Sequence, residues 1–207
     1  MRGNRFMALA PVMLALSVPT VAQEAQPAAA EAPRNTPGLP DELVGIDEVL
    51  TGGLLNDPTS IAWETYGANL ASELITDETY PGGGAALRIT MRQAGQVYDG
   101  GLNIPLLVPI PSGERVTIGF LARTIASDAA DGRGRIGVRF QQNRAPYPGF
   151  GDTVLAVGPE WGFFEVTAVA DQSFASDAIV AIQFGLAAQT VEVGQAIVVS
   201  GTSTISD

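Results

Sequence analysis

A series of short β-type runs separated by glycine and proline constrains this chain more than any other feature. From about residue 41 onward, stretches of alternating apolar and polar side chains are interrupted by breaks such as residues 81–84 (PGGG) and 111–113 (PSG). Alternation with a period of two is typical of strands that bury one face, and Gly and Pro clusters mark the turns between them. Past residue 40, only a short piece at 43–50 has a helical pattern. The clear strand candidates are residues 86–92, 102–110, 115–123, 135–142, 163–169, 178–186 and 190–199; the weaker ones are 61–66, 73–75 and 153–157.

About ten strands at this spacing are typical of an all-β sandwich or barrel. Within each run, one set of alternate side chains is apolar and predicts the face toward the core. The predicted core faces are Leu87, Ile89 and Met91; Val116, Ile118, Phe120 and Ala122; Ile136, Val138 and Phe140; and Val180, Ile182, Phe184 and Leu186. Trp63 and Trp161, within or beside strands, are also expected to fill the core. The outward positions predict a polar sheet face that carries Arg123, Arg139, Gln141 and Gln183.

The first 22 residues have the pattern of a secretory signal peptide. Arg2 and Arg5 precede an apolar run at residues 6–18, and small residues at 20–22 (TVA) offer a cleavage site. An uncleaved membrane anchor is the alternative, but two prolines interrupt the apolar run and it is short for a span. Without a cysteine, a lipoprotein anchor is excluded. We therefore expect a periplasmic or secreted protein with no stable membrane insertion after signal cleavage.

The composition of residues 23–40 differs from that of the rest of the chain. This segment is rich in Ala, Pro, Gln and Glu and has no hydrophobic period, which predicts an extended, disordered linker. The β-sandwich domain is expected to occupy residues 41–207.

The amino-acid composition removes several classes of function. The chain contains no cysteine, histidine or lysine, and all 11 of its basic residues are arginine. The missing side chains exclude disulfides, the commonest general base, the commonest metal ligand and any lysine nucleophile. Without residues 1–22, nine arginines stand against 22 acidic residues, a net charge of −13. Such a surface repels nucleic acid and anionic lipid, so nucleic-acid binding is excluded.

Four residues form the candidate binding site. Tyr98 lies in the loop at 95–101, and Tyr147 lies in a Pro/Gly-held loop directly after the strand that carries Gln141. Aromatic rings stack on the apolar face of a sugar, and planar Arg and Gln groups read pairs of hydroxyls. Arg123, on the predicted strand at residues 115–123, is the fourth residue of the candidate site. A merely solvated sheet face, with Tyr147 pinning its own loop, is the simpler alternative.

Several stretches resemble the carbohydrate-binding modules of the family 4 and family 9 type. They are residues 81–89 (PGGGAALRI), 116–123 (VTIGFLAR), 141–147 (QQNRAPY), 160–161 (EW) and 184–194 (FGLAAQTVEVG). The resemblance implies a galactose-binding-like jelly roll, a β-sandwich of two antiparallel sheets, as found beside bacterial xylanases and other glycoside hydrolases. It implies a polysaccharide or oligosaccharide ligand in a cleft on the concave sheet, at positions matching Tyr98, Arg123, Gln141 and Tyr147.

The same resemblance implies that loop carboxylates could hold a structural calcium ion; no cofactor is certain from the sequence. Asp57, Asp77 and Glu78 are the candidates, although no EF-hand spacing surrounds them.

Two other functions stay open from the sequence. The domain could dock on an envelope protein as an interaction or structural module, because one fold hosts many functions. A glycoside hydrolase would need two carboxylates spaced across a cleft, and its candidates, Glu160, Glu165 and Glu192, have no motif around them. The leading prediction is therefore a non-catalytic carbohydrate-binding domain.

Overall fold

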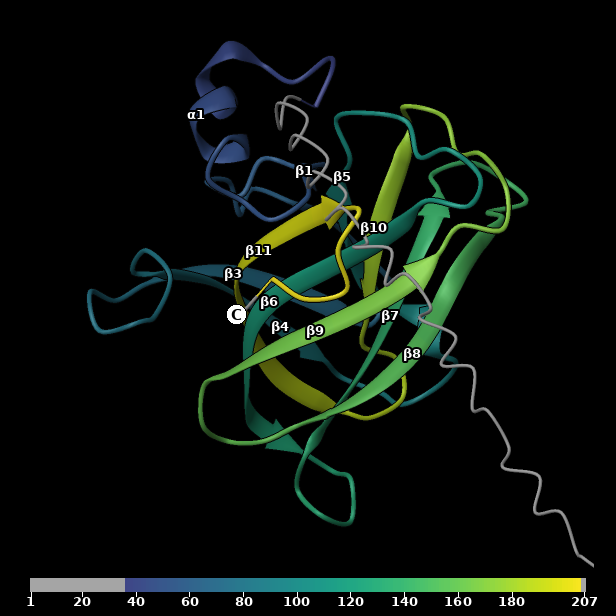
Figure 1. Ribbon diagram of the computed structural model, residues 1–207. Helices are drawn as coiled ribbons and strands as arrows, with labels where there is room; N and C mark the ends of the chain where they lie inside the picture. Colours follow the sequence, from purple (N-terminus) through teal and green to yellow (C-terminus); the bar gives the residue numbers. More distant parts are fainter. Residues whose placement is uncertain (1–35, 206–207) are drawn as a thin grey trace, which may run out of the picture. The chain divides into compact units, whose positions relative to one another are not determined.

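Two antiparallel β-sheets contain nearly all of the regular structure of the computed structural model, which describes residues 36–205 (Figure 1). The six-stranded sheet has the order β3-β4-β11-β6-β9, with β1 paired to β11; the five-stranded sheet has the order β2-β5-β10-β7-β8. The six-stranded sheet consists of β1 (Gly53–Leu54), β3 (Leu70–Thr76), β4 (Ala85–Met91), β6 (Arg115–Ser127), β9 (Gly162–Val169) and β11 (Gln189–Ser200). The five-stranded sheet consists of β2 (Glu64–Tyr66), β5 (Gly101–Pro105), β7 (Gly134–Gln142), β8 (Gly149–Val157) and β10 (Ala178–Gln183). The predicted jelly-roll sandwich is confirmed.

Within residues 36–205, helical structure is limited to three short pieces. These are the 3-10 helices η1 (Asp41–Leu43) and η2 (Val97–Asp99) and the α-helix α1 (Val44–Asp47). Among residues 36–205, no helix has the length and apolar character needed to cross a membrane. The predicted signal peptide at 1–22 and the linker up to residue 35 lie outside the described residues.

The core lies between the two sheets and is formed by the alternate apolar side chains of both. Phe140 of β7 stacks on Phe150 of β8 with ring centroids 5.1 Å apart, and Phe150 lies 5.0 Å from Phe174. Trp63 belongs to this core, as predicted. Of the predicted core faces, one residue is misplaced: Leu186 is 38% exposed, because β10 ends at Gln183 and the strand alternation does not continue past it.

A buried carboxylate ties the start of the described chain to the sandwich. Asp47 is 1% exposed and accepts hydrogen bonds from the backbone N–H and the hydroxyl of Thr36, at 2.7 and 3.0 Å, and from the backbone N–H of Leu54 in β1. Residues 36–40 have a linker-like composition, yet Thr36 is held in the fold by these bonds.

Candidate functional site

The outward-pointing side chains of the five-stranded sheet form a polar surface, here called the five-stranded face. Because directly opposite residues in paired strands share a face, the register aligns one row across the sheet. This central row contains Glu64 of β2, Asn103 of β5, Ala181 of β10 and Arg139 of β7, and it ends at Asp152 of β8. It places two carboxylates, an amide and a guanidinium group along one line.

The floor of this face is made of small and apolar side chains on β10. Ala181 and Ile179 point outward, yet they are only 0% and 4% exposed, because longer side chains stand on the flanking strands. The longer polar side chains on β5 and β7 therefore form the accessible surface of this face.

Asn103 leaves one hydrogen-bonding atom without a partner. Its Oδ1 is buried and, among the described side chains, is the single buried nitrogen or oxygen with no hydrogen bond. A buried acceptor left unpaired costs about 1–3 kcal/mol.

Arg139 lies flat across β8 and binds Asp152. Its Nη1 donates to Asp152 Oδ1 at 2.6 Å, and the two side chains are 26% and 64% exposed. A Cβ atom at Gly149 would lie 2.6 Å from Arg139 Nε, so the guanidinium group needs a glycine beneath it. The position of Arg139 on the face therefore depends on Gly149.

Two side chains from neighbouring elements limit the face at one end. A Cβ atom at Gly101 would lie 2.6 Å from the hydroxyl of Tyr66, and one at Gly137 would lie 2.5 Å from Cγ2 of Val97. Burial raises the pKa of Tyr66, and a side-chain hydrogen bond with Gln183 opposes part of that rise. Tyr66 and Val97 therefore cover the glycines next to the central row and form a wall beside it.

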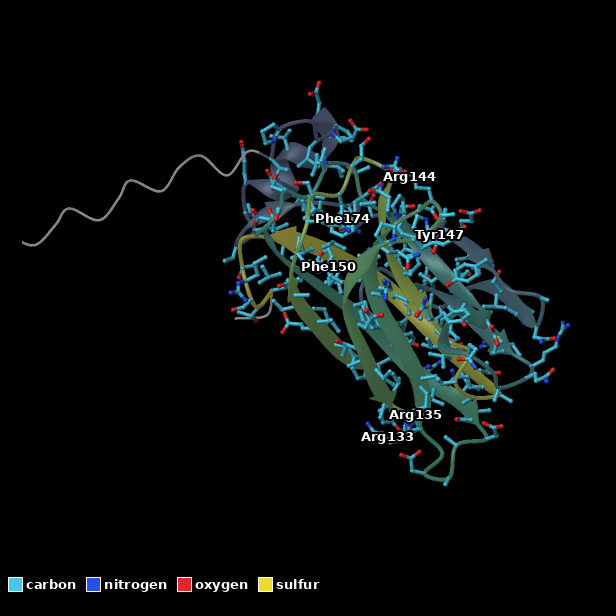
Figure 2. The ribbon with its side chains drawn as sticks, turned by 90° about the vertical axis from the view of Figure 1, so that its right-hand side faces the viewer. Arg133, Arg135, Arg144, Tyr147, Phe150 and Phe174 are labelled. Atoms are coloured by element: carbon cyan, nitrogen blue, oxygen red, sulfur yellow. The ribbon has the colours of Figure 1, made fainter. Side chains whose placement is uncertain are left out.

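Three of the four predicted site residues belong to the five-stranded face or its flanking loops. Gln141 is half-buried on β7, two residues beyond Arg139 and on the same side of the strand. Tyr147 is 51% exposed in the loop after β7, at the same end of the molecule as Arg144 and opposite to Arg133 and Arg135 (Figure 2). Tyr98 is 60% exposed in η2, the short helix that brings Val97 over Gly137.

Arg123 is on the other sheet. It lies on β6, opposite Glu192 of β11, on the outer face of the six-stranded sheet. The expectation that it shares a face with Gln141 is therefore wrong. Alternation within a strand separates inward from outward side chains, but it does not say to which of two sheets the strand belongs.

The guanidinium group of Arg123 is held by other side chains of the protein. Its guanidinium carbon lies 4.9 Å from the ring centroids of both Tyr80 and Trp161, and its Nε donates to Glu192 at 2.7 Å. Trp161 was expected in the core and instead packs on this outer face, half-buried, with its ring 5.3 Å from that of Tyr80. These contacts give Arg123 a structural role.

Two of the three candidate glycosidase carboxylates are engaged by the protein itself. Glu192 is 0% exposed and binds Arg88 at 2.6 Å as well as Arg123. Burial would raise the pKa of Glu192, but the hydrogen bonds and charges of the two arginines outweigh it and hold the pKa below its usual value. An ionised, enclosed carboxylate cannot serve as a general acid. Glu165 accepts a hydrogen bond from the backbone N–H of Ile205 at 2.6 Å, and Glu160 lies on an exposed turn.

Two of the candidate calcium ligands form hydrogen bonds within their own turns. Asp57 and Asp77 each accept hydrogen bonds from the backbone N–H and the hydroxyl of the threonine two residues later. Within residues 36–205, no three acidic or histidine side chains are grouped so that they could hold a metal ion. The carboxylates therefore act as turn acceptors.

Comparison with solved structures connects this geometry to known proteins. A CBM4 module superposes with a TM-score of 0.53 at 19% sequence identity, over 67% of this chain and 94% of the module. The CBM22-1 xylan-binding domain from Paenibacillus barcinonensis Xyn10C gives 0.53 at 13% identity, over 75% of this chain and 99% of that domain. The fold is that of a carbohydrate-binding module. The predicted resemblance is thus confirmed at the level of the fold.

The same fold also occurs as part of a larger enzyme. An arabinose-bound α-L-arabinofuranosidase, MgGH51, superposes with a TM-score of 0.56 at 15% identity, over 74% of this chain but only 27% of the enzyme. No family profile matches the sequence, and no curated protein does.

The candidate site residues Asn103, Asp152 and Tyr66 are not predicted by the sequence reasoning. Asn103 alternates with Leu102 and Ile104, so its outward position could have been found, but its burial depends on the neighbouring strands. Asp152 comes into contact with Arg139 across the pairing of β7 and β8, where the register shifts between Val138 and Phe140. The two glycines of the GFG sequence at 149–151 are the only local sign of that irregularity.

Proposed function

We propose that this chain is an exported, non-catalytic carbohydrate-binding domain that holds a saccharide across its five-stranded face. The observation that carries the proposal is the group of planar hydrogen-bonding side chains, Asn103, Arg139 and Gln141, on one face of the five-stranded sheet. Planar amide and guanidinium groups match pairs of sugar hydroxyls.

Each group has a distinct role in this proposal. Asn103 and Gln141 provide amide groups, and Arg139 provides N–H donors, along the sugar. Tyr147 and Tyr98 offer rings at the two ends of the face, where they stack on pyranose C–H groups. Because the polar groups stand on paired strands, little conformational freedom is lost when the ligand binds.

The proposed location follows from the N-terminal sequence. Removal of residues 1–22 after export would leave the domain in the periplasm or outside the cell, where polysaccharide ligands occur. The CBM22-1 domain that shares the fold is described as xylan-binding, which makes xylan a sensible first probe. The absence of histidine and the enclosure of Glu192 support a binding role over hydrolysis.

Affinity electrophoresis and calorimetry of the purified chain against arabinoxylan, mixed-linkage β-glucan and hydroxyethylcellulose test the proposal. We expect retention by at least one polymer, and we expect Gln141→Ala to weaken it by about threefold to tenfold, the effect of one or two hydrogen bonds. Gln195→Ala is a matched control, because Gln195 is half-buried on β11 of the other sheet. If a folded protein binds none of these polymers, or if both variants weaken binding equally, the proposed site is wrong.

A further inference from the structure

The arginines of the five-stranded face are already neutralised by the protein. Arg139 pairs with Asp152, and Arg135, on the same side of β7, pairs with Asp131 at 2.8 Å. At the other end of the central row, Glu64 is exposed, and no ion pair joins it to a described residue. The uncompensated charge along the central row is therefore negative.

The backbone of β8 is shaped to bring Asp152 to Arg139. The pairing of β7 and β8 shifts by one position between Val138 and Phe140, so that one residue of β7 faces two of β8. Gly151 has φ +75°, a left-handed conformation that glycine adopts without strain. A bulge of this kind redirects a side chain, and here the carboxylate of Asp152 lies 2.6 Å from Arg139 Nη1.

We propose that Asp152 determines the charge specificity of the five-stranded face: by occupying Arg139, it restricts the site to uncharged saccharides. The inference rests on the proposed function, because it assigns the ligand class of the same face. A uronate or sulfate group that approached Arg139 would meet the negative charge of Asp152 beside it and the unpaired Glu64 at the other end of the row. The net charge of −11 adds a general repulsion toward acidic polymers.

Arg139 nevertheless keeps donors for a neutral ligand. Its bond to Asp152 uses Nη1, and no hydrogen bond from Nε or Nη2 is formed with the described residues. A sugar hydroxyl can accept a hydrogen bond from such a donor without displacing the carboxylate. The second oxygen of Asp152 can in turn accept a hydrogen bond from a sugar hydroxyl. Together, Arg139 offers hydrogen-bond donors and Asp152 offers an acceptor, and a sugar hydroxyl can bind to both.

The test uses pairs of polymers that share a backbone and differ in charge: arabinoxylan with carboxymethyl xylan, and hydroxyethylcellulose with carboxymethylcellulose. We expect the unmodified chain to bind the neutral member of a pair at least about tenfold more tightly than the anionic one. Asp152→Asn frees Arg139, and we expect it to lower that ratio by about tenfold by improving binding to the anionic member. Added salt should weaken this new binding and leave neutral binding nearly unchanged.

Asp131→Asn is the matched control. It also frees an arginine on β7, but Arg135 lies beyond Gly137, which Val97 covers. We expect Asp131→Asn to leave the neutral-to-anionic ratio unchanged, and equal urea midpoints would show that both variants fold. Tight binding of the anionic polymers by the unmodified chain, or an unchanged ratio in Asp152→Asn, overturns the inference while leaving carbohydrate binding intact. Failure to bind any of the four polymers, together with failure to bind mixed-linkage β-glucan, overturns the proposed function itself.

Discussion

The same substitution, Arg→Ala, at Arg123 and at Arg139 should distinguish a residue that stabilises the fold from a residue that binds ligand. Their side chains are 25% and 26% exposed, and each bonds to one carboxylate at 2.7 or 2.6 Å. They differ in the partner: Glu192 is 0% exposed, whereas Asp152 is 64% exposed. The change Arg→Ala therefore has different consequences on the two sheets.

The expected loss of unfolding free energy depends on how deeply the carboxylate partner of each arginine is buried. Removing one member of a buried pair costs about 3–5 kcal/mol, because the other charge is left uncompensated. In Arg123→Ala, Arg88 still binds Glu192, which reduces the loss, but the contacts with the rings of Tyr80 and Trp161 disappear as well. We expect a decrease of about 3 kcal/mol in the free energy of unfolding, and a fall in Tm of about 6–12 °C for a domain of this size. In Arg139→Ala, an exposed pair is lost and the decrease should stay below about 1 kcal/mol.

Urea unfolding followed by far-UV circular dichroism measures the stability, and affinity electrophoresis on the best neutral polymer measures binding. We expect Arg123→Ala to be destabilised and to bind normally at a temperature where it is folded, and Arg139→Ala to be stable and to bind weakly. If Arg123→Ala abolishes binding at unchanged stability, Arg123 is a ligand contact and the assignment of the site to the five-stranded sheet is refuted.

Two further predictions concern Glu192 and Tyr147. The folded-state pKa of Glu192 is lowered, so its contribution to stability is present above the unfolded-state value of about 4.3 and is lost as the pH falls through the folded-state value. The loss of unfolding free energy between neutral and acidic pH, measured by urea titration, should therefore be smaller in Glu192→Gln than in the unmodified chain; an identical loss in the two would contradict this reasoning. Tyr147→Ala should weaken saccharide binding with Tm nearly unchanged, because Tyr147 is 51% exposed. A large drop in Tm measured by calorimetry would instead assign Tyr147 to packing.

The period-two pattern predicted the sandwich because each strand buries one complete face. It placed side chains such as Phe120 and Phe140 in the core, and both are 0% exposed. The pattern carries no information on which strands become neighbours, so it joined Arg123 and Gln141 on one face although their strands belong to different sheets. Pairing between distant strands is decided by the packing of the whole domain, which no short window of sequence contains.

The candidate site was predictable only in part for the same reason. Gln141 and Tyr147 could be found from residue type and local pattern. Trp161 was misplaced, because its aromatic ring suggested burial while its actual partner is a guanidinium group from another strand. Asp152 depends on a shift in strand register, which becomes visible only when β7 and β8 are paired.

The buried carboxylate of Asp47 has a mechanical consequence. It holds both Thr36 and Leu54, and β1 is hydrogen-bonded to β11, which lies between β4 and β6 within its sheet. A pulling force applied through the chain before Thr36 would thus be passed to an interior strand, and the load would be shared by the ladders on both of its sides. Separation of this segment from the domain would therefore require the loss of a buried hydrogen-bond cluster rather than the peeling of an edge strand.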